Sequence, residues 1–366
     1  MDGKGQRRTI SGKIEWELPF IFFLYVKIEI IMKAIGFKEN FPIENEQSLQ
    51  DIEIDMPKAS GKDLLVEVKA ISVNPVDYKI RQRAKPEEGK WKVIGWDAAG
   101  IVKEVGEDVS LFKPGDEVWY AGDLTRQGSN AEFQLVDERI VGKKPQNFSF
   151  DEAAALPLTT LTAWELLFDR MQVERDDPDK SILVIGAAGG VGSILVQLAK
   201  KLTKLTVIGT ASRDITKSWL QGLGVDHVVN HKNKLSEEFT KHNLSEPDYV
   251  ISLTATGQHI DEVIKLIKPQ GRFGFIDDPD ALNVMPFKRK SVSTHIELMF
   301  TRSLFQTDDM IEQHHILNQA AKLIDKGVIK TTVGDHFGKI NAENLRRAHA
   351  LLESHKAKGK IVLEGF

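Results

Sequence analysis

Apolar and polar residues follow two different patterns along this chain. Between residues 32 and 156, short apolar runs separated by turn residues predict strands, among them 63–73, 100–106 and 117–119. From residue 181 onward, apolar runs alternate with helical stretches, which predicts parallel strands joined by right-handed helical crossovers. These later runs are 181–185, 205–210, 227–230, 249–253 and 271–277. The sequence therefore predicts an α/β protein with a barrel-like β region and a doubly wound parallel sheet.

The segments outside these two patterns predict further helices, a last strand and an N-terminal extension. Ser149 caps a short helix that Pro157 interrupts, and the chain is helical again from about Phe300 to Lys326. A last strand, 360–364, is expected to return to the β region. Residues 1–31 do not share the pattern: the apolar run 18–26 is far shorter than the roughly 20 residues that span a bilayer, and no signal cleavage site follows it. We expect the fold to begin at Met32, residues 1–31 to be an extension, and no membrane partner.

A glycine-rich turn between a strand and a helix is the clearest chemical signal. The run 181–185 leads into residues 186–192, Gly-Ala-Ala-Gly-Gly-Val-Gly, and an amphipathic helix follows. Small residues let the backbone approach a pyrophosphate, and the helix N-terminus offers free N–H groups and the positive end of its dipole. Alanine stands where the common fingerprint has its first glycine, and a turn without ligand is the plainer alternative. We expect a dinucleotide to contact Ala187, Gly189, Gly190, Val191 and Gly192.

The residues after the second strand of the parallel sheet bear on which dinucleotide binds. NAD-binding units carry an acidic residue there, which accepts from the ribose hydroxyls. Here the strand is followed by Ser212 and Arg213, with Lys217 one helical turn further. A guanidinium pairs well with a 2′-phosphate, which a carboxylate would repel, so NADPH is favoured over NADH. Asp214 leaves NADH open if its carboxylate occupies the ribose position, and a solvated helix start would explain the same charges.

Composition narrows the classes of function. The chain has 366 residues, enough for two domains, and its net charge of −4 argues against binding nucleic acid through electrostatics. It contains no cysteine, which excludes disulfides, thiolate catalysis and cysteine-bound zinc. We expect a cytoplasmic enzyme with a small-molecule substrate.

Several stretches together resemble the medium-chain dehydrogenase/reductase superfamily, in its quinone oxidoreductase and zinc-type alcohol dehydrogenase-like branch. They are 72–81, 95–100, 156–163, 186–193 and 359–364. The resemblance implies a GroES-like catalytic domain made of residues 32–156 and 303–366. It also implies a Rossmann NAD(P)-binding domain of residues 157–302, with the active site in the cleft between the two. A homodimer is expected too, from the resemblance and because the apolar strand 271–276 is expected near a sheet edge.

The resemblance allows the zinc ligands to be checked one by one. In alcohol dehydrogenases of this superfamily, a cysteine, a histidine and a second cysteine bind the catalytic zinc. The matching residues here are Asn74, Trp96 and Leu158, none of which is a usual zinc ligand. The cysteine-rich lobe for a structural zinc is also missing, since 121–130 is a short loop. We therefore expect no metal.

The same resemblance places the catalytic candidates near Asn74, which would lie beside the nicotinamide or the substrate carbonyl and donate an N–H. Asp77 would orient its neighbours. Lys79 stands where quinone reductases of this type often have a tyrosine, and it would either stabilise an oxyanion or be an ordinary surface lysine. Further cofactor contacts are expected from the carboxyl edge of the sheet and, by resemblance, from a threonine near the carboxamide. They are Thr162, Asn230, Leu253, Thr254, Phe275 and Ile276.

Without a metal to activate an alcohol, the expected chemistry is hydride transfer from NADPH to an electron-poor acceptor. The acceptor would be a quinone or an α,β-unsaturated carbonyl. Two alternatives stay open: a zinc-type alcohol dehydrogenase-like protein acting on an alcohol or aldehyde, and an NADPH-binding sensor or interaction protein with little turnover.

Overall fold

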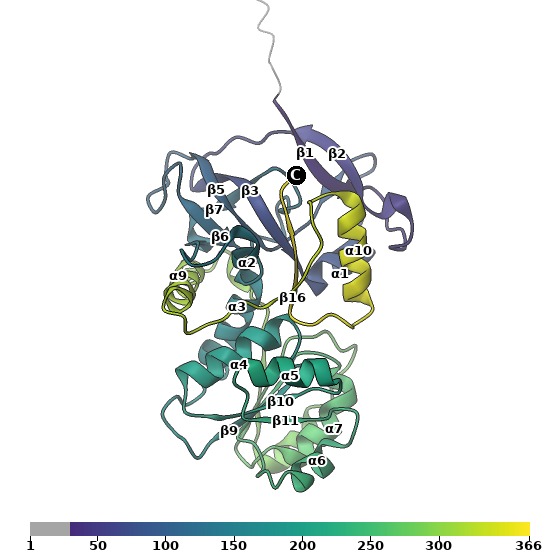
Figure 1. The fold of residues 1–366 in the computed structure, drawn as a ribbon, viewed down its shortest axis with the longest axis vertical. Coiled ribbons are helices and arrows are strands. Elements are labelled where there is room, and N and C mark those ends of the chain that lie inside the picture. Colours follow the sequence, from purple (N-terminus) through teal and green to yellow (C-terminus); the bar gives the residue numbers. More distant parts are fainter. Residues whose placement is uncertain (1–29) are drawn as a thin grey trace, which may run out of the picture.

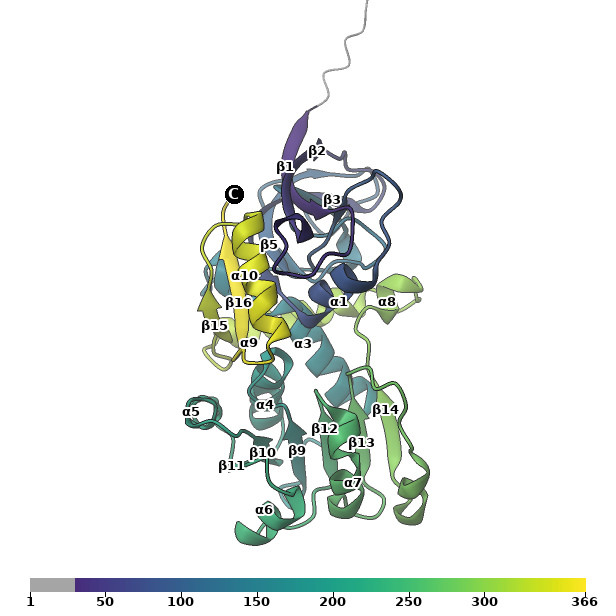
Figure 2. The ribbon, with the colours of Figure 1, turned by 90° about the vertical axis from the view of Figure 1, so that its right-hand side faces the viewer.

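A computed structural model describes residues 30–366, so nearly all of the predicted extension, residues 1–31, lies outside the described residues. The first strand, β1 (Ile31–Phe37), begins one residue before Met32. The chain folds into two bodies stacked along its long axis, one rich in antiparallel strands and one built on a parallel sheet (Figures 1 and 2). The predicted α/β class is confirmed.

The first body contains two sheets. A small sheet has the order β2-β1-β4, with β2 at Gln50–Asp55 and β4 at Lys92–Val93. The larger sheet has the order β15-β16-β3-β5-β6-β8, and β7 also pairs with β3. Its strands are β3 (Asp63–Val73), β5 (Ala98–Val105), β6 (Glu117–Tyr120), β7 (Phe133–Asp137), β8 (Val141–Lys143), β15 (Val333–His336) and β16 (Lys360–Glu364). The predicted strand 63–73 coincides with β3, which is central and almost wholly buried.

The C-terminal segment returns to this body, as predicted. Strand β16 pairs antiparallel with β3, so that Ile361 lies opposite Val73, and the Ser72 hydroxyl donates to the Ile361 carbonyl at 2.8 Å. Helix α10 (Ala342–Glu353) packs beside helix α1 (Pro75–Arg83), which follows β3 directly. The chain end therefore fixes the segment in which β3 passes into α1.

The second body is a parallel sheet of six strands with the order β11-β10-β9-β12-β13-β14. The strand order reverses beside β9, as in doubly wound sheets, and ligands bind at the carboxyl edge next to such a reversal. The strands are β9 (Ser181–Ile185), β10 (Thr206–Thr210), β11 (His227–Val229), β12 (Tyr249–Ser252), β13 (Arg272–Phe275) and β14 (Ser293–Ile296). The helices of this body are α4 (Gly190–Leu202), α5 (Asp214–Gly222), α6 (Leu235–Lys241) and α7 (Thr256–Leu266).

Strand β14 forms one edge of this sheet. The apolar run 271–276 is expected near a sheet edge, and β13 lies next to the edge, since it pairs with β12 on one side and with β14 on the other. The polar, largely exposed sequence of β14, Ser-Thr-His-Ile, gives no apolar signal, so the sequence does not predict this strand. The two outer strands of the sheet are β11 and β14.

Helix α3 (Pro157–Trp164), with a π-helical continuation over Glu165–Arg170, packs against α4 of the second body and against β6 of the first, and one hydrophobic core runs through both bodies. Helices α2 (Phe150–Ala154) and α9 (Glu312–Asp325) pack on the strands of the first body, and α8 (Thr301–Leu304) follows the parallel sheet in the chain. Short 3-10 turns span Glu46–Ser48, Glu138–Ile140 and Met285–Lys290. Among the described residues no helix combines the length and apolar character needed to cross a bilayer. The predicted domain boundaries stay predictions; the one at 302/303 falls inside α8.

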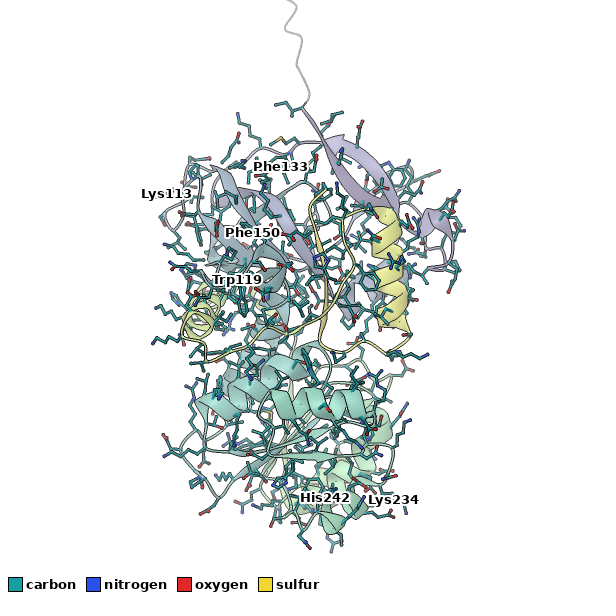
Figure 3. All side chains as sticks on the ribbon, viewed as in Figure 1. Lys113, Trp119, Phe133, Phe150, Lys234 and His242 are labelled. Atoms are coloured by element: carbon teal, nitrogen blue, oxygen red, sulfur yellow. The ribbon has the colours of Figure 1, made fainter. Side chains whose placement is uncertain are left out.

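Side chains fill both bodies (Figure 3). Trp119, on β6, is fully buried in the first body, whereas Lys234 and His242 lie on the outer end of the second (Figure 3). The burial of large aromatic side chains in the first body gives it a rigid support for the segment that carries Asn74.

Gly359, just before β16, provides a test of this arrangement. Its φ is +60°, and a Cβ there would lie 2.4 Å from the Thr332 carbonyl oxygen. Gly365 has φ +74° but open space around the same position. Both alanine variants incur left-handed strain of roughly 1–2 kcal/mol, and only Gly359→Ala adds steric overlap of about 1–3 kcal/mol. Thermal and urea unfolding should show the larger loss for Gly359→Ala; equal losses would contradict the close packing described here.

Candidate functional site

The glycine turn is packed tightly enough that side chains would not fit at two of its positions. A Cβ on Gly192 would lie 2.4 Å from the Ala187 carbonyl oxygen, and one on Gly190 would lie 2.9 Å from Cδ of Lys360. Gly189 caps α4, and Gly186 adopts a left-handed φ of +80°. This geometry presents the first turn of α4 to the carboxyl edge of the sheet, where a pyrophosphate fits. Ala187 is itself buried.

The segment 356–360, which we call the C-terminal strap, lies against this turn. The Gly359 N–H donates to the Ala188 carbonyl at 3.0 Å. The Lys358 ammonium lies 4.5 Å from the centre of the Trp219 ring on α5, and the Trp219 indole donates to Ser193 of α4 at 2.9 Å. The strap continues into β16, a strand of the first body, and therefore links the glycine turn to that body.

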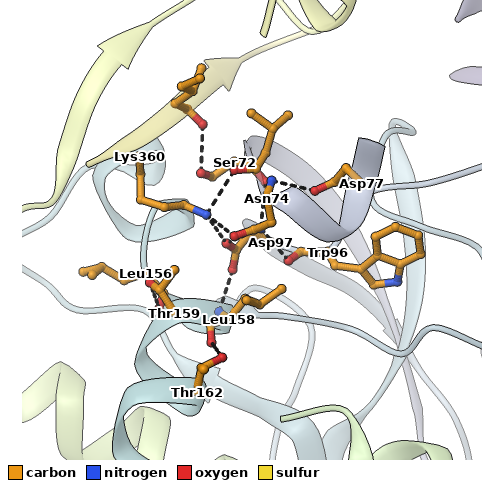
Figure 4. A network of polar contacts seen from close by, with 12 residues as sticks. Ser72, Asn74, Asp77, Trp96, Asp97, Leu156, Leu158, Thr159, Thr162 and Lys360 are labelled. Atoms are coloured by element: carbon orange, nitrogen blue, oxygen red, sulfur yellow. Dashed lines mark hydrogen bonds and ion pairs between the residues drawn. The ribbon is translucent and has the colours of Figure 1, made fainter. Parts of the chain in front are cut away.

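The strap ends in Lys360, whose ammonium is buried between the two bodies (Figure 4). Its Nζ atom lies 2.9 Å from Oδ2 of Asp97 and 3.2 Å from the Val73 carbonyl, and it also donates to Oδ1 of Asn74. The side chains of Lys360 and Asp97 are 2% and 0% exposed. The other carboxylate oxygen of Asp97 accepts the Leu158 N–H at 2.8 Å. All three ammonium protons thus have acceptors within a closed polar network.

The Asn74 amide is held from both sides in this network. Its Nδ2 donates to Oδ2 of Asp97 at 2.8 Å and to the Trp96 carbonyl at 3.1 Å, while its Oδ1 accepts from Lys360. Both amide protons therefore already have protein acceptors. The expectation that Asn74 presents an N–H to a substrate carbonyl is not met by this geometry, because Asp97 and Trp96 engage those protons.

Asp77 caps the helix that Asn74 begins. The Asn74 backbone N–H donates to Oδ2 of Asp77 at 2.6 Å, which fits the orienting role expected for this residue. Asp77 is fully buried, and its burial raises the pKa of its carboxyl to about 7, against the opposing effects of the Asn74 N–H and Lys360. Burial also raises the pKa of Asp97, opposed first by Lys360. The polar centre of the network is thus shielded from solvent.

Lys79 lies outside this network. Its ammonium pairs with Asp278 at 2.9 Å, and both side chains are substantially exposed. This ion pair joins α1 to the loop after β13, so it bridges the two bodies. Because the ammonium is turned toward Asp278, the structure does not bring it to Asn74 as an oxyanion-stabilising group.

The phosphate-binding candidates also have protein partners. Arg213 donates to the Lys356 carbonyl of the strap at 3.1 Å. Lys217 pairs with Asp214 at 3.3 Å, and the Asp214 side chain is 99% exposed. Ser212 precedes them and is half-buried. The three candidates form an exposed polar edge beside the end of β10, with Arg213 linked to the strap.

The remaining cofactor candidates differ in how open they are. Leu253 and Ile276 are half-buried and Thr254 is exposed, all at the carboxyl edge of the sheet, whereas Phe275 is buried against Phe273 with ring centres 5.7 Å apart. The structure therefore favours a core role for Phe275.

Two other candidates use their side chains for local structure. The Thr162 hydroxyl donates to the Leu158 carbonyl of its own helix at 2.8 Å. The Asn230 side chain accepts the Lys232 N–H at 3.0 Å, which shapes the turn after β11. Val191 lies half-buried in the first turn of α4 and remains available to a dinucleotide.

The donor chemistry at the centre of the site does not fit zinc. Asn74 contributes an amide whose atoms are engaged, and Leu158 contributes a backbone N–H that donates to Asp97. The Trp96 indole donates to the Asp123 carbonyl at 3.2 Å. Zinc sites in proteins use thiolate, imidazole or carboxylate ligands. Of the two carboxyl groups in this network, Asp97 is paired with a lysine and Asp77 accepts the Asn74 backbone N–H.

A second cluster, Asp151, His336 and Glu364, brings three ligand-type atoms within 4.8 Å of one another at the outer end of β16. The Gly338 N–H donates to Nδ1 of His336 at 3.1 Å. A neutral imidazole therefore carries its proton on Nε2, toward the two carboxylates, which disfavours a metal at that nitrogen.

Asp97 and Lys360 are functional candidates that reasoning from the sequence missed. They lie 263 residues apart in the chain. One signal was available: Lys360 is followed in its strand by three apolar residues, Ile361–Leu363, and a lysine in a strand that is buried on both faces requires an anionic or carbonyl partner.

The raised pKa of Asp77 gives a pH prediction. Its carboxyl has a pKa of about 7 in the folded protein, against a usual 3.8, so between about pH 4 and pH 7 only the unfolded chain releases the proton. As the pH rises from about 4 to 7, the free energy of unfolding of the wild type should therefore decrease relative to that of Asp77→Asn. Urea unfolding at several pH values checks this, and parallel curves for the two proteins would contradict it.

Two family models match the chain. The Alcohol dehydrogenase GroES-like domain covers residues 60–147, and the Zinc-binding dehydrogenase domain covers residues 223–363. A zinc-type alcohol dehydrogenase-like protein of Staphylococcus epidermidis is 40% identical over 338 residues, which is 91% of this chain and 99% of that protein. A Rhizobium etli structure assigned to the zinc-dependent alcohol dehydrogenases is 54% identical with a TM-score of 0.89, covering 92% of this chain and 99% of that one.

Reductases appear among the more distant relatives. The NADPH-dependent alkenal/one oxidoreductase of Arabidopsis thaliana is 31% identical, over 85% of this chain and 74% of that protein. The quinone oxidoreductase of Escherichia coli, solved with NADPH, is 25% identical with a TM-score of 0.76, covering 91% of this chain and 99% of that one. Taken with the fold and the glycine turn, these matches show that the chain belongs to the medium-chain dehydrogenase/reductase superfamily of oxidoreductases.

Proposed function

We propose that this protein is a zinc-independent, NADPH-dependent reductase that transfers hydride to a quinone or to the β-carbon of an α,β-unsaturated carbonyl compound. One observation carries the proposal: the residues at the centre of the site form a closed network of amide, carboxylate and ammonium. This network offers no set of metal ligands that would polarise an alcohol for hydride removal.

When bound, NADPH supplies a hydride, and an acceptor with an electron-poor carbon takes it without metal activation. The chain contributes binding and orientation. The first turn of α4 and the glycine turn would hold the pyrophosphate, and Ser212, Arg213 and Lys217 are the residues that would bind the 2′-phosphate. The buried network around Asn74 fixes the segment in which β3 passes into α1, and positioning of the reactants is the protein's main contribution in such reactions.

The reductase relatives support this choice of acceptor. The Arabidopsis relative is named for alkenals and enones and for NADPH, and the Escherichia coli structure is a quinone oxidoreductase bound to NADPH. The nearer relatives are named zinc-type alcohol dehydrogenase-like. We give the donor set of this chain more weight than that name.

The proposal predicts NADPH oxidation with a panel of quinones and enones, slower oxidation with NADH, and no effect of a zinc chelator. Absorbance of the reduced nicotinamide measures the rates, and elemental analysis of the same preparation measures zinc. A preparation that oxidises alcohols and stops after chelation would support the alcohol dehydrogenase alternative. Tight NADPH binding without turnover of any acceptor would support a sensor or interaction protein instead. The cytoplasmic location expected from the sequence stays a prediction.

We also propose that two copies of the chain pair along β14. This strand is one of the two outer strands of its sheet, so its backbone has a free pairing edge among the described residues. Its last residue, Ile296, and the nearby Leu298 are 67% and 49% exposed. A twofold axis at this edge would join two sheets into one and cover these side chains.

The dimer has a matched test. Light scattering should give twice the chain mass of 41.1 kDa for the wild type, and Ile296→Glu should shift the mass toward the monomer. Ile215→Glu places the same charge on an isoleucine that is 62% exposed on α5, and it should leave the mass unchanged. A monomeric wild type would refute the pairing.

A further inference from the structure

The ammonium of Lys360 lies where two functional parts of the molecule meet. On one side, Cδ of Lys360 would be 2.9 Å from a Cβ on Gly190, so the side chain passes directly beside the glycine turn. On the other side, its Nζ donates to Asn74 and pairs with Asp97. A single side chain therefore contacts both the expected pyrophosphate end of the cofactor site and the expected hydride-transfer end.

The hydrogen bonds around Asn74 select one orientation of its amide. Lys360 has only donors, so it requires Oδ1 of Asn74 on its side. Asp97, when ionised, has only acceptors, so it requires Nδ2 on the other side. Reversing the amide would place donor against donor and acceptor against acceptor inside a buried network, where each unmatched polar group costs about 1–3 kcal/mol.

We propose that Lys360 is a positioning residue of the hydride-transfer site, which fixes the Asn74 amide in one orientation and ties it to the glycine turn. The inference rests on the proposed function. It also explains how the site dispenses with zinc: the fixed positive charge at its centre belongs to a lysine of the C-terminal strap. Nothing in the names of the relatives assigns a role to this residue.

A double substitution separates positioning from simple charge balance. Lys360→Met alone would leave Asp97 buried without its cation and endanger folding. Lys360→Met combined with Asp97→Asn keeps the pair at zero net charge and changes little volume. It replaces the acceptor facing Asn74 with an amide and removes the donor on the other side, so the orientation of Asn74 is no longer selected. Lys103→Met, on the exposed side of β5 in the same sheet, is the control.

The double variant should have a kcat roughly 100-fold lower, because the network then no longer holds the start of α1 in place, and a misplacement of about 1 Å by a substitution away from the reacting atoms produces an effect of that size. NADPH affinity, followed by fluorescence titration, should stay within about threefold of the wild type, and Lys103→Met should match the wild type in both quantities. A folded double variant with wild-type kcat would overturn the proposal, because charge balance alone would then suffice. An equal loss in kcat and in NADPH affinity would also overturn it and point to a cofactor-binding role.

A second readout does not depend on turnover. The side-chain amide signals of Asn74 in 15N spectra of the wild type, assigned by their loss in Asn74→Asp, should exchange slowly with solvent because both protons are hydrogen-bonded. Lys360→Met/Asp97→Asn should shift these signals and speed their exchange, and unchanged signals would refute the positioning role. If the wild type reduces no acceptor, the proposed function fails by itself, and this spectrum still decides the role of Lys360.

Discussion

The ion pair between Asp97 and Lys360 is the interaction on which the rest of the site depends. Burying two charges costs several kcal/mol per ion unless their mutual attraction and further hydrogen bonds offset the loss of water. Here every partner is supplied: the ammonium has three acceptors, and the carboxylate accepts from Leu158, Asn74 and Lys360. The pair is therefore stable only when α3, β5, the start of α1 and β16 are all in place.

This dependence explains how two bodies with separate sheets present one site. The strap contacts the glycine turn through Gly359 and reaches Asn74 through Lys360. A displacement of one body relative to the other would therefore break one of these contacts. Helix α1 is held in turn by Arg81, a fully buried guanidinium that pairs with Glu353 of α10 at 2.6 Å. Both supports of the Asn74 segment thus come from the last 25 residues of the chain, Ala342–Phe366.

Local patterns predicted much of the fold, because strands and turns depend on neighbouring residues. The run 63–73, the glycine turn at 186–192 and the returning strand 360–364 all appear as expected. The sequence did not predict two features of the structure, each for a physical reason. The side chains of strand β14 are polar and largely exposed, and apolar periodicity cannot detect such a strand. One partner of Asn74, Lys360, lies 286 residues away in the chain, and no short-range spacing encodes that contact. Lys79 was an attractive candidate because it is near Asn74 in sequence, yet it pairs with Asp278 across the interface.

A lysine ammonium lies beside Asn74 and Asp97, where we propose that it provides the fixed positive charge in place of a metal ion. X-ray diffraction from crystals of the NADPH complex, recorded on both sides of the zinc absorption edge, distinguishes the ammonium from a zinc ion. We expect no anomalous peak within the network and an ammonium within hydrogen-bonding distance of Asn74 and Asp97. An anomalous peak near Asn74, with Lys360 displaced from Asp97, would contradict it.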